Sequence, residues 1–384
     1  MQTISTALFT PINVGNSPLS HRIVHCPLTR IRTNADRVPV PLMTEYHKQR
    51  ISEGGLLIAE ATIISEDAGA YRLTPGIYND KQIEGWRNIT TVVHDNGGFI
   101  YLQLWHAGRA GVSSLIPGNK PPVSASAIPI NDKNTIGEDS EVPHALEVEE
   151  ISQIVKTYTQ AAKNAICAGF DGVEIHSANG YLLDQFINSS SNVRTDQYGG
   201  SIENRARFTL EVVESVSKAI GQNRTGIRLS PWSGFQDVKD NTPYETWGYI
   251  VEQLQEKHPN LAYLHFVEPR DDYVSGPNPR KDRKEIMEKD SIEPFRKVWK
   301  GPLITAGGYT TNPKRAFETA EKLDNTLIGF GRTFIANPDL VLRLKNDWPL
   351  NKYDRSTFYG GDSTGYTDYP FYNSSAASDI FKKN

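Results

Sequence analysis

Cysteine is scarce in this chain of 384 residues, which contains two. Cys26 and Cys167 each fall in an apolar stretch, so we expect both to be buried free thiols. Disulfide-stabilised secreted domains and cysteine zinc sites both need several cysteines at characteristic spacings. The sequence therefore predicts no disulfide framework and no cysteine metal site, and reduced thiols favour a cytoplasmic protein.

The chain also lacks an excess of positive charge and any long hydrophobic run. Its net charge is −4 and its pI is about 6.2. A nucleic-acid-binding domain usually carries a clustered basic face, so we expect no nucleic-acid partner. Residues 1–10 contain no basic region followed by an apolar run, and no stretch reaches the roughly 20 residues of a membrane span. We therefore expect no membrane partner.

Short apolar or β-branched runs alternate with amphipathic helical patterns along the chain. Such alternation favours right-handed crossovers and a parallel sheet, and eight units are the number that closes a barrel. We predict an α/β fold in which residues 1–384 form a single TIM (β/α)8 barrel domain. The expected strands are 22–26, 56–62, 99–104, 172–175, 225–229, 262–266, 303–305 and 326–329. The expected helices are 41–52, 81–95, 149–168, 201–220, 243–256, 286–300, 313–322 and 338–345.

An open doubly wound sheet is the alternative, but it predicts a glycine-rich turn after the first strand. Residues 27–30 there read Pro-Leu-Thr-Arg. Two excursions, 111–146 and 268–285, follow strands, so in a barrel they would emerge at the catalytic face unless they are merely solvated insertions. The C-terminal extension 346–384 contains an aromatic-rich part, 353–372, that must pack on the barrel surface or fold over its mouth.

Three polar side chains at close spacing end the fourth expected strand. Period-two alternation points His176 into the barrel, and Asn179 and Tyr181 follow in the next loop. Two converging N–H donors with a phenol nearby can polarise a carbonyl oxygen and deliver a proton to a neighbouring atom. The alternative is a satisfied core histidine followed by an Asn-Gly turn.

The C-terminal ends of the expected strands carry many polar groups. Together they would form a hydrogen-bonding floor suited to a planar ring rich in heteroatoms. Arg228 could stabilise negative charge on such a ring, or form an internal ion pair with Glu174 or Glu268, or both. The strand-end residues are Thr29, Glu60, Gln103, Trp105, His176, Arg228, Glu268, Gly307, Gly308, Gly331 and Arg332.

Glycine pairs follow the last two expected strands. Gly307 and Gly308 follow the seventh strand, and Gly329 and Gly331 lie at the end of the eighth, with Arg332 next to Gly331. In barrels this region often binds phosphate through backbone N–H groups, and Arg332 would add a charged contact. A phosphate site beside a polar floor implies a phosphorylated cofactor or substrate, and flavin mononucleotide (FMN) fits both parts.

Several longer motifs occur in order along the chain. They are PLTRIR at 27–32, QLWHAGR at 103–109, GVEIHSANGYLLDQF at 172–186, RTDQYGGSIENRARF at 194–208, GIRLSP at 226–231, GFGR at 329–332 and GYTDYP at 365–370. This series closely resembles the Old Yellow Enzyme family, which includes fungal members and plant oxophytodienoate reductases. The resemblance covers nearly all of the chain from about Phe9 onward.

The resemblance implies an ene reductase. FMN would be reduced by NADPH and reoxidised, in ping-pong fashion, by an alkene conjugated to a carbonyl or nitro group. His176 and Asn179 would hold the substrate oxygen, and Tyr181 would protonate the α-carbon. The implied cofactor-binding residues are Pro27, Leu28, Thr29, Ala61, Gln103, Arg228, Gly307, Gly308, Gly331 and Arg332. The expected pocket residues are His176, Asn179, Trp105 and Tyr366, with Tyr71 and Phe235 as further candidates.

Other functions fit parts of the pattern. A phosphosugar isomerase or aldolase could use the phosphate site for its substrate, although no strand-end lysine stands ready for a Schiff base. A flavin-binding protein without ene-reductase turnover would keep the flavin site. A metal enzyme is disfavoured because His176 lacks a second histidine at ligand spacing. We expect enone substrates and NADPH as small-molecule partners, and a monomer or homodimer.

Overall fold

Eight parallel strands close into a barrel in the computed structural model, which describes residues 6–269, 290–322 and 324–372. The order around the barrel is β10-β11-β12-β3-β4-β5-β8-β9. This confirms the predicted fold, and each strand begins and ends within two residues of its expected bounds. The strands are β3 Ile23–His25, β4 Leu56–Ile63, β5 Phe99–Trp105, β8 Gly172–Ser177, β9 Thr225–Leu229, β10 Tyr263–Val267, β11 Leu303–Ala306 and β12 Thr326–Phe330.

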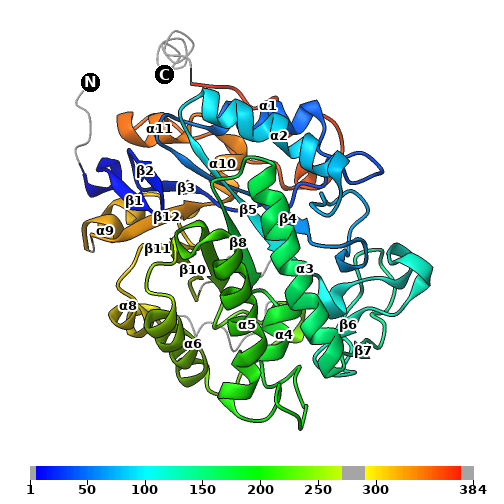
Figure 1. Cartoon of the computed structure of the whole chain (residues 1–384). Coiled ribbons are helices and arrows are strands. Elements are labelled where there is room, and N and C mark those ends of the chain that lie inside the picture. The colour runs from blue at the N-terminus through cyan, green and yellow to red at the C-terminus, as the bar shows by residue number, and fades with distance from the viewer. Residues whose placement is uncertain (1–5, 270–289, 323, 373–384) are drawn as a thin grey trace.

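Helices surround the strands (Figure 1). Proline occupies the first helical turn of α1, α6 and α8, where its missing N–H costs no intrahelical hydrogen bond. The first part of the sixth expected helix, 286–289, lies outside the described residues. The helices are α1 Pro41–Arg50, α2 Asp80–Asp95, α3 Val148–Cys167, α4 Leu182–Ile187, α5 Ile202–Ile220, α6 Pro243–Lys257, α8 Glu293–Val298, α9 Lys314–Lys322, α10 Arg332–Ala336 and α11 Leu340–Asn346.

The register of β8 gathers polar side chains inside the barrel. Glu174 pairs in register with Gln103 of β5, and His176 pairs with Arg228 of β9. Val173 and Ile175 alternate with them and are fully buried in the main hydrophobic core, which includes residues of the surrounding helices. The predicted inward direction of His176 is therefore confirmed, and Glu174 points the same way.

A short hairpin that the sequence did not predict closes the N-terminal end of the barrel. It comprises β1 Ile12–Val14 and β2 Ser17–Leu19. Val14 and Leu19 pack in one cluster with Tyr101 and Tyr263, which come from strands β5 and β10. Because the hairpin and these aromatic rings fill the N-terminal end, the open cavity lies at the opposite end of the barrel.

The two predicted excursions have different outcomes. Residues 111–146 contain a small parallel pair, β6 Val123–Ser124 and β7 His144–Ala145, which lies at the edge of the barrel beyond α3 (Figure 1). Most of 268–285 lies outside the described residues. The Cys167 prediction was wrong, because this residue ends α3 on its exposed side, while Cys26 is buried as predicted. Within the described part of the chain, no helix is long and apolar enough to cross a membrane.

Buried arginines hold the C-terminal extension across the barrel, beside α1 and α2 (red in Figure 1). Arg30 donates to the carbonyls of Phe358 at 2.9 Å and of Gly365 at 2.8 Å. Arg50 of α1 donates to the Tyr366 carbonyl at 2.9 Å. These bonds place the extension at the barrel mouth. The sequence analysis predicted that it would either pack on the barrel surface or fold over the mouth, and the second alternative is the one observed.

Candidate active site

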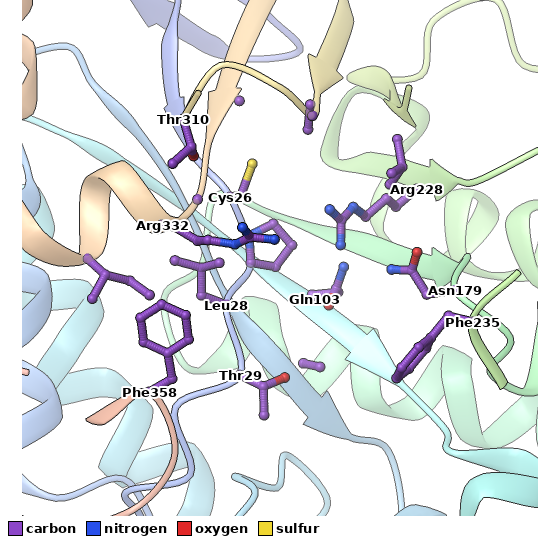
Figure 2. A pocket seen from close by; sticks show the side chains of 18 of the residues that line it. Cys26, Leu28, Thr29, Gln103, Asn179, Arg228, Phe235, Thr310, Arg332 and Phe358 are labelled. Carbon is purple, nitrogen blue, oxygen red and sulfur yellow. The ribbon is translucent and has the colours of Figure 1, made fainter. Parts of the chain in front are cut away.

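A cavity of about 330 Å³ opens at the C-terminal ends of the barrel strands. All ten residues predicted to bind the cofactor line it, and so do His176, Asn179, Tyr181, Tyr71 and Phe235. Figure 2 shows that Arg228, Gln103 and Asn179 converge from one side, while Arg332 and Thr310 lie on the other. The structure therefore brings most of the predicted site residues together in one cavity.

Gln103, Arg228 and the buried Glu174 form a polar floor. Gln103 donates from Nε2 to Glu174 Oε1 at 2.8 Å, and His265 Nδ1 lies 2.7 Å from Glu174 Oε2. Desolvation would raise the pKa of Glu174, but His265, Arg228 and Gln103 outweigh it and keep that pKa below its usual range. Glu268 instead contacts Thr305 and Arg315. Arg228 thus lies beside an internal carboxylate and also faces the cavity, so both predicted roles are compatible.

His176 is a neutral imidazole in the cavity wall. It is 4% exposed, and burial, helped by the charge of Arg228, holds its pKa well below 6.5. Its Nδ1 atom and the Asn179 Oδ1 atom have no hydrogen-bond partner among the described residues. Both residues line the cavity, so the N–H of His176 and the Nδ2 amide of Asn179 are suited to donate to the oxygen of a ligand, whereas Asn179 Oδ1 can only accept.

A tight turn after β8 positions Asn179. Both Asn179 and Gly180 adopt left-handed backbone conformations, with φ of 57° and 73°. The Asn179 N–H donates to Ser230 Oγ at 2.7 Å, and the Gly180 N–H donates to Asp184 Oδ2 at 2.8 Å. Gln185 of the unpredicted helix α4 donates to the Gly180 carbonyl at 2.7 Å. The Asn-Gly turn is thus real, and it directs the Asn179 side chain into the cavity.

Tyr181 stands edge-on between two aromatic neighbours. Its ring centroid is 5.0 Å from Trp105 and 5.1 Å from His176, with interplanar angles of 89° and 82°. Burial raises the pKa of Tyr71, and a hydrogen bond with Tyr181 partly offsets that rise. Trp105 stacks on Tyr71 at 6.2 Å. The Tyr181 phenol is therefore fixed in direction beside the His176 imidazole.

The opposite end of the cavity is built from glycine backbone. Gly307 and Gly308 have φ of 118° and 75°, which a residue with a side chain adopts at a cost. A Cβ on Gly331 would lie 3.2 Å from the nearest atom of Leu28, so glycine keeps this part of the cavity lining uncrowded. Arg332 and Thr310 lie beside them. Cys26 also lines the cavity, but its thiol stays protonated and is a poor nucleophile, because burial raises its pKa to about 12.

Two expected pocket residues do not line the cavity, and both predictions were wrong. Trp105 is 1% exposed and lies behind Tyr71 and Tyr181. Tyr366 is fully buried, because it stacks on Tyr46 at 4.2 Å and carries Arg32 over its ring at 4.2 Å. Both rings support the wall from behind.

The sequence analysis missed several residues at the cavity mouth. Arg355, Phe358 and Tyr359 line it from the C-terminal extension, and Tyr359 is 66% exposed. Phe235 forms the facing wall, on a loop in which Gln236 and Asp237 have left-handed φ of 59° and 57°. The pair of adjacent aromatics in the extension was the available signal, but it did not show which ring would reach the mouth.

Comparison with known proteins agrees with this geometry. A model of the NADH:flavin oxidoreductase / NADH oxidase family matches residues 7–351. The flavin oxidoreductase hxnT of Emericella nidulans is 46% identical over 380 residues, covering 95% of this chain and 97% of that protein. The 12-oxophytodienoate reductase 1 of Oryza sativa subsp. japonica is 46% identical over 369 residues, covering 95% and 93%. The structure of morphinone reductase in complex with tetrahydroNAD has a TM-score of 0.85 at 42% identity, covering 96% and 98%.

Proposed function

The chain belongs to the NADH:flavin oxidoreductase / NADH oxidase family, the Old Yellow Enzyme family that its motifs resemble, and from that premise we propose that it is an ene reductase. It reduces the C=C bond of α,β-unsaturated carbonyl or nitro compounds with electrons from NADPH. The flavin family replaces the phosphosugar isomerase or aldolase alternative. A flavin-binding protein without turnover remains an outcome that experiment can reveal.

The FMN that this family uses fits the residues of the cavity. Its phosphate suits the cavity lining at Gly307, Gly308 and Gly331, where the first two have left-handed φ, with Arg332 as the charged partner. Its ring suits the floor of Gln103 and Arg228. Thr29, Pro27, Leu28 and Ala61 line the same cavity and would complete the contact. When bound, FMN supplies the hydride acceptor and donor that the side chains lack.

His176 and Asn179 hold the carbonyl or nitro oxygen of the substrate in this proposal. A neutral imidazole donates one hydrogen bond without competing for a proton, and the low pKa of His176 keeps it neutral through the physiological range. As negative charge develops on that oxygen, two fixed donors stabilise it. One such donor is worth roughly a hundred- to a thousand-fold in rate.

Tyr181 donates the proton to the α-carbon. Its ring is held edge-on to His176, so the acid and the oxygen donors face the same part of the cavity. A positioned acid contributes about a hundred- to ten-thousand-fold. Tyr71, Phe235 and Tyr359 add aromatic walls, which select substrates by shape rather than by charge.

NADPH enters the same cavity as the substrate in this proposal. The chain has no glycine-rich dinucleotide fingerprint after its first barrel strand, so the nicotinamide needs another place to bind. Morphinone reductase, a structural relative, has been solved in complex with tetrahydroNAD, a nicotinamide analogue, which supports binding of nicotinamide within this fold. The two ligands then alternate, and the kinetics are ping-pong.

The observation that carries the proposal is the neutral His176, which lines the same cavity as Asn179 and Tyr181. Phenols imitate the charged substrate oxygen, so they test His176 directly. His176→Ala should weaken phenol binding to the FMN-loaded protein by about 10- to 150-fold, the value of a hydrogen bond to a charged group. The long-wavelength charge-transfer band should weaken with it.

The control is His94→Ala, which removes a half-exposed histidine that pairs with Asp171 outside the cavity. Phenol affinity should not change in that variant. Unchanged phenol affinity in His176→Ala would remove His176 from the oxygen-binding role.

A further inference from the structure

Glu174 is a buried carboxylate that the proposed mechanism does not use. It is fully buried inside the barrel and lies under the cavity floor, between Gln103 at 2.8 Å and His265 at 2.7 Å. A buried carboxylate is costly unless its oxygens accept good hydrogen bonds. Both of its oxygens do so, one from each neighbour.

The carboxylate sets the direction of the Gln103 amide. An ionised carboxylate accepts hydrogen bonds and donates none, so Gln103 must turn its Nε2 toward Glu174. This leaves the Gln103 Oε1 as the acceptor end of the amide, and Gln103 lines the same cavity as Arg228, whose guanidinium is a donor. That pattern complements a ring in which an N–H lies between two carbonyls, such as the pyrimidine part of FMN.

Glu174 also balances charge beneath the ring. Its partner His265 lies 2.7 Å from the carboxylate, and burial lowers the pKa of that imidazole, as it does for His176. His265 and Arg228 both act on Glu174 and lower its pKa, and Arg228 is the one of the two that lines the cavity. Arg228 alone would favour the more negative, reduced form of a bound flavin, and the carboxylate behind it moderates that preference.

We propose that Glu174 is a positioning residue that fixes the acceptor side of the Gln103 amide toward FMN and, by balancing Arg228, sets both the FMN affinity and the reduction potential. The inference rests on FMN as the cofactor, and it does not depend on which alkene is reduced.

Glu174→Gln tests this inference with little change in shape. The new amide has one acceptor oxygen and one NH2 group, so it cannot accept from both Gln103 and His265, and one of these two hydrogen bonds is lost or reversed. We expect the apoprotein to bind oxidised FMN at least tenfold more weakly, measured by quenching of FMN fluorescence. We also expect the ratio of affinities for reduced over oxidised FMN to rise about tenfold, which raises the potential by about 30 mV for a two-electron couple.

Two further variants separate this role from general damage to the fold. Asp171→Asn removes a carboxylate just before the start of β8, at the other end of the barrel, and should leave both quantities unchanged. Glu174→Asp keeps the negative charge, but its shorter side chain no longer reaches Gln103. The affinity for oxidised FMN should therefore fall, while the reduction potential of FMN should shift less than in Glu174→Gln.

A folded Glu174→Gln variant with wild-type affinity and potential would overturn the inference. If Glu174→Gln does not fold, wild-type FMN affinity in Glu174→Asp would overturn it instead. These measurements need no enone or nicotinamide, so failure of enone turnover in the wild type would contradict the proposed function and leave this result standing.

Discussion

Tyr181→Phe separates the two halves of the proposed reaction. The ring should stay in place, because Trp105 and His176 pack edge-on against it at 5.0 Å and 5.1 Å, so the variant loses only the hydroxyl. Loss of a positioned acid should slow reoxidation by an enone by about 10²- to 10⁴-fold, or about 2.7–5.4 kcal/mol of barrier. Reduction by NADPH needs no proton from Tyr181, and its rate should stay within about threefold, well below the effect of losing an acid. Anaerobic stopped-flow absorbance measures each half-reaction alone.

Tyr71→Phe is the matched control for this prediction. It removes the Tyr71 hydroxyl, and with it the hydrogen bond between Tyr71 and Tyr181, but leaves the Tyr181 hydroxyl in place as the acid. A neutral hydrogen bond contributes about 0.5–1.5 kcal/mol, so reoxidation should slow by no more than about tenfold. The reasoning is refuted if Tyr181→Phe is reoxidised at the wild-type rate, or if Tyr71→Phe loses as much activity as Tyr181→Phe.

Further predictions concern the cofactor, the pH response and the kinetics. Arg332→Ala should weaken FMN binding by about 10- to 150-fold, the value of a lost hydrogen bond to a charged group. Riboflavin lacks the phosphate, so its affinity should not change. Equal losses of affinity for FMN and riboflavin would contradict a contact between Arg332 and the phosphate. Burial raises the pKa of Glu60 to about 7 from 4.5, so its proton stabilises the fold below pH 4.5, and this contribution is lost as pH rises through 7. The unfolding free energy of the wild type relative to Glu60→Gln should therefore fall by about 3 kcal/mol between these pH values in urea titrations, whereas a constant difference would contradict the shift. Steady-state data with NADPH and enone varied together should give parallel double-reciprocal lines with mutual competition, and converging lines would indicate a ternary complex instead.

The barrel and most of the cavity were predictable because they follow from local patterns. The eight apolar runs form strands that begin and end within two residues of the expected bounds, and parallel strands must place their C-terminal ends at one edge. His176, Arg228 and Gln103 therefore meet in one cavity. The helix α4 was missed because all its side chains are buried, which leaves no amphipathic period to detect.

The errors concern contacts between distant segments. The C-terminal extension has no periodic pattern, and its path depends on Arg30, Arg32 and Arg50 donating to its backbone carbonyls. This path puts Tyr359 at the cavity mouth and Tyr366 in the core, whereas the sequence prediction placed Tyr366 in the pocket and did not name Tyr359. The contact of Glu174 with His265 likewise joins residues 91 positions apart, which strand periodicity alone does not reveal.

The visible spectrum of the purified protein, recorded anaerobically, tests the central claim most directly. It is taken before NADPH, after NADPH, and again after cyclohexenone. The account predicts a yellow protein that bleaches with NADPH and regains its colour with the enone. A flavin that bleaches and is not reoxidised by any enone would contradict ene reduction, and a colourless protein that takes up no added FMN would contradict the flavin site itself.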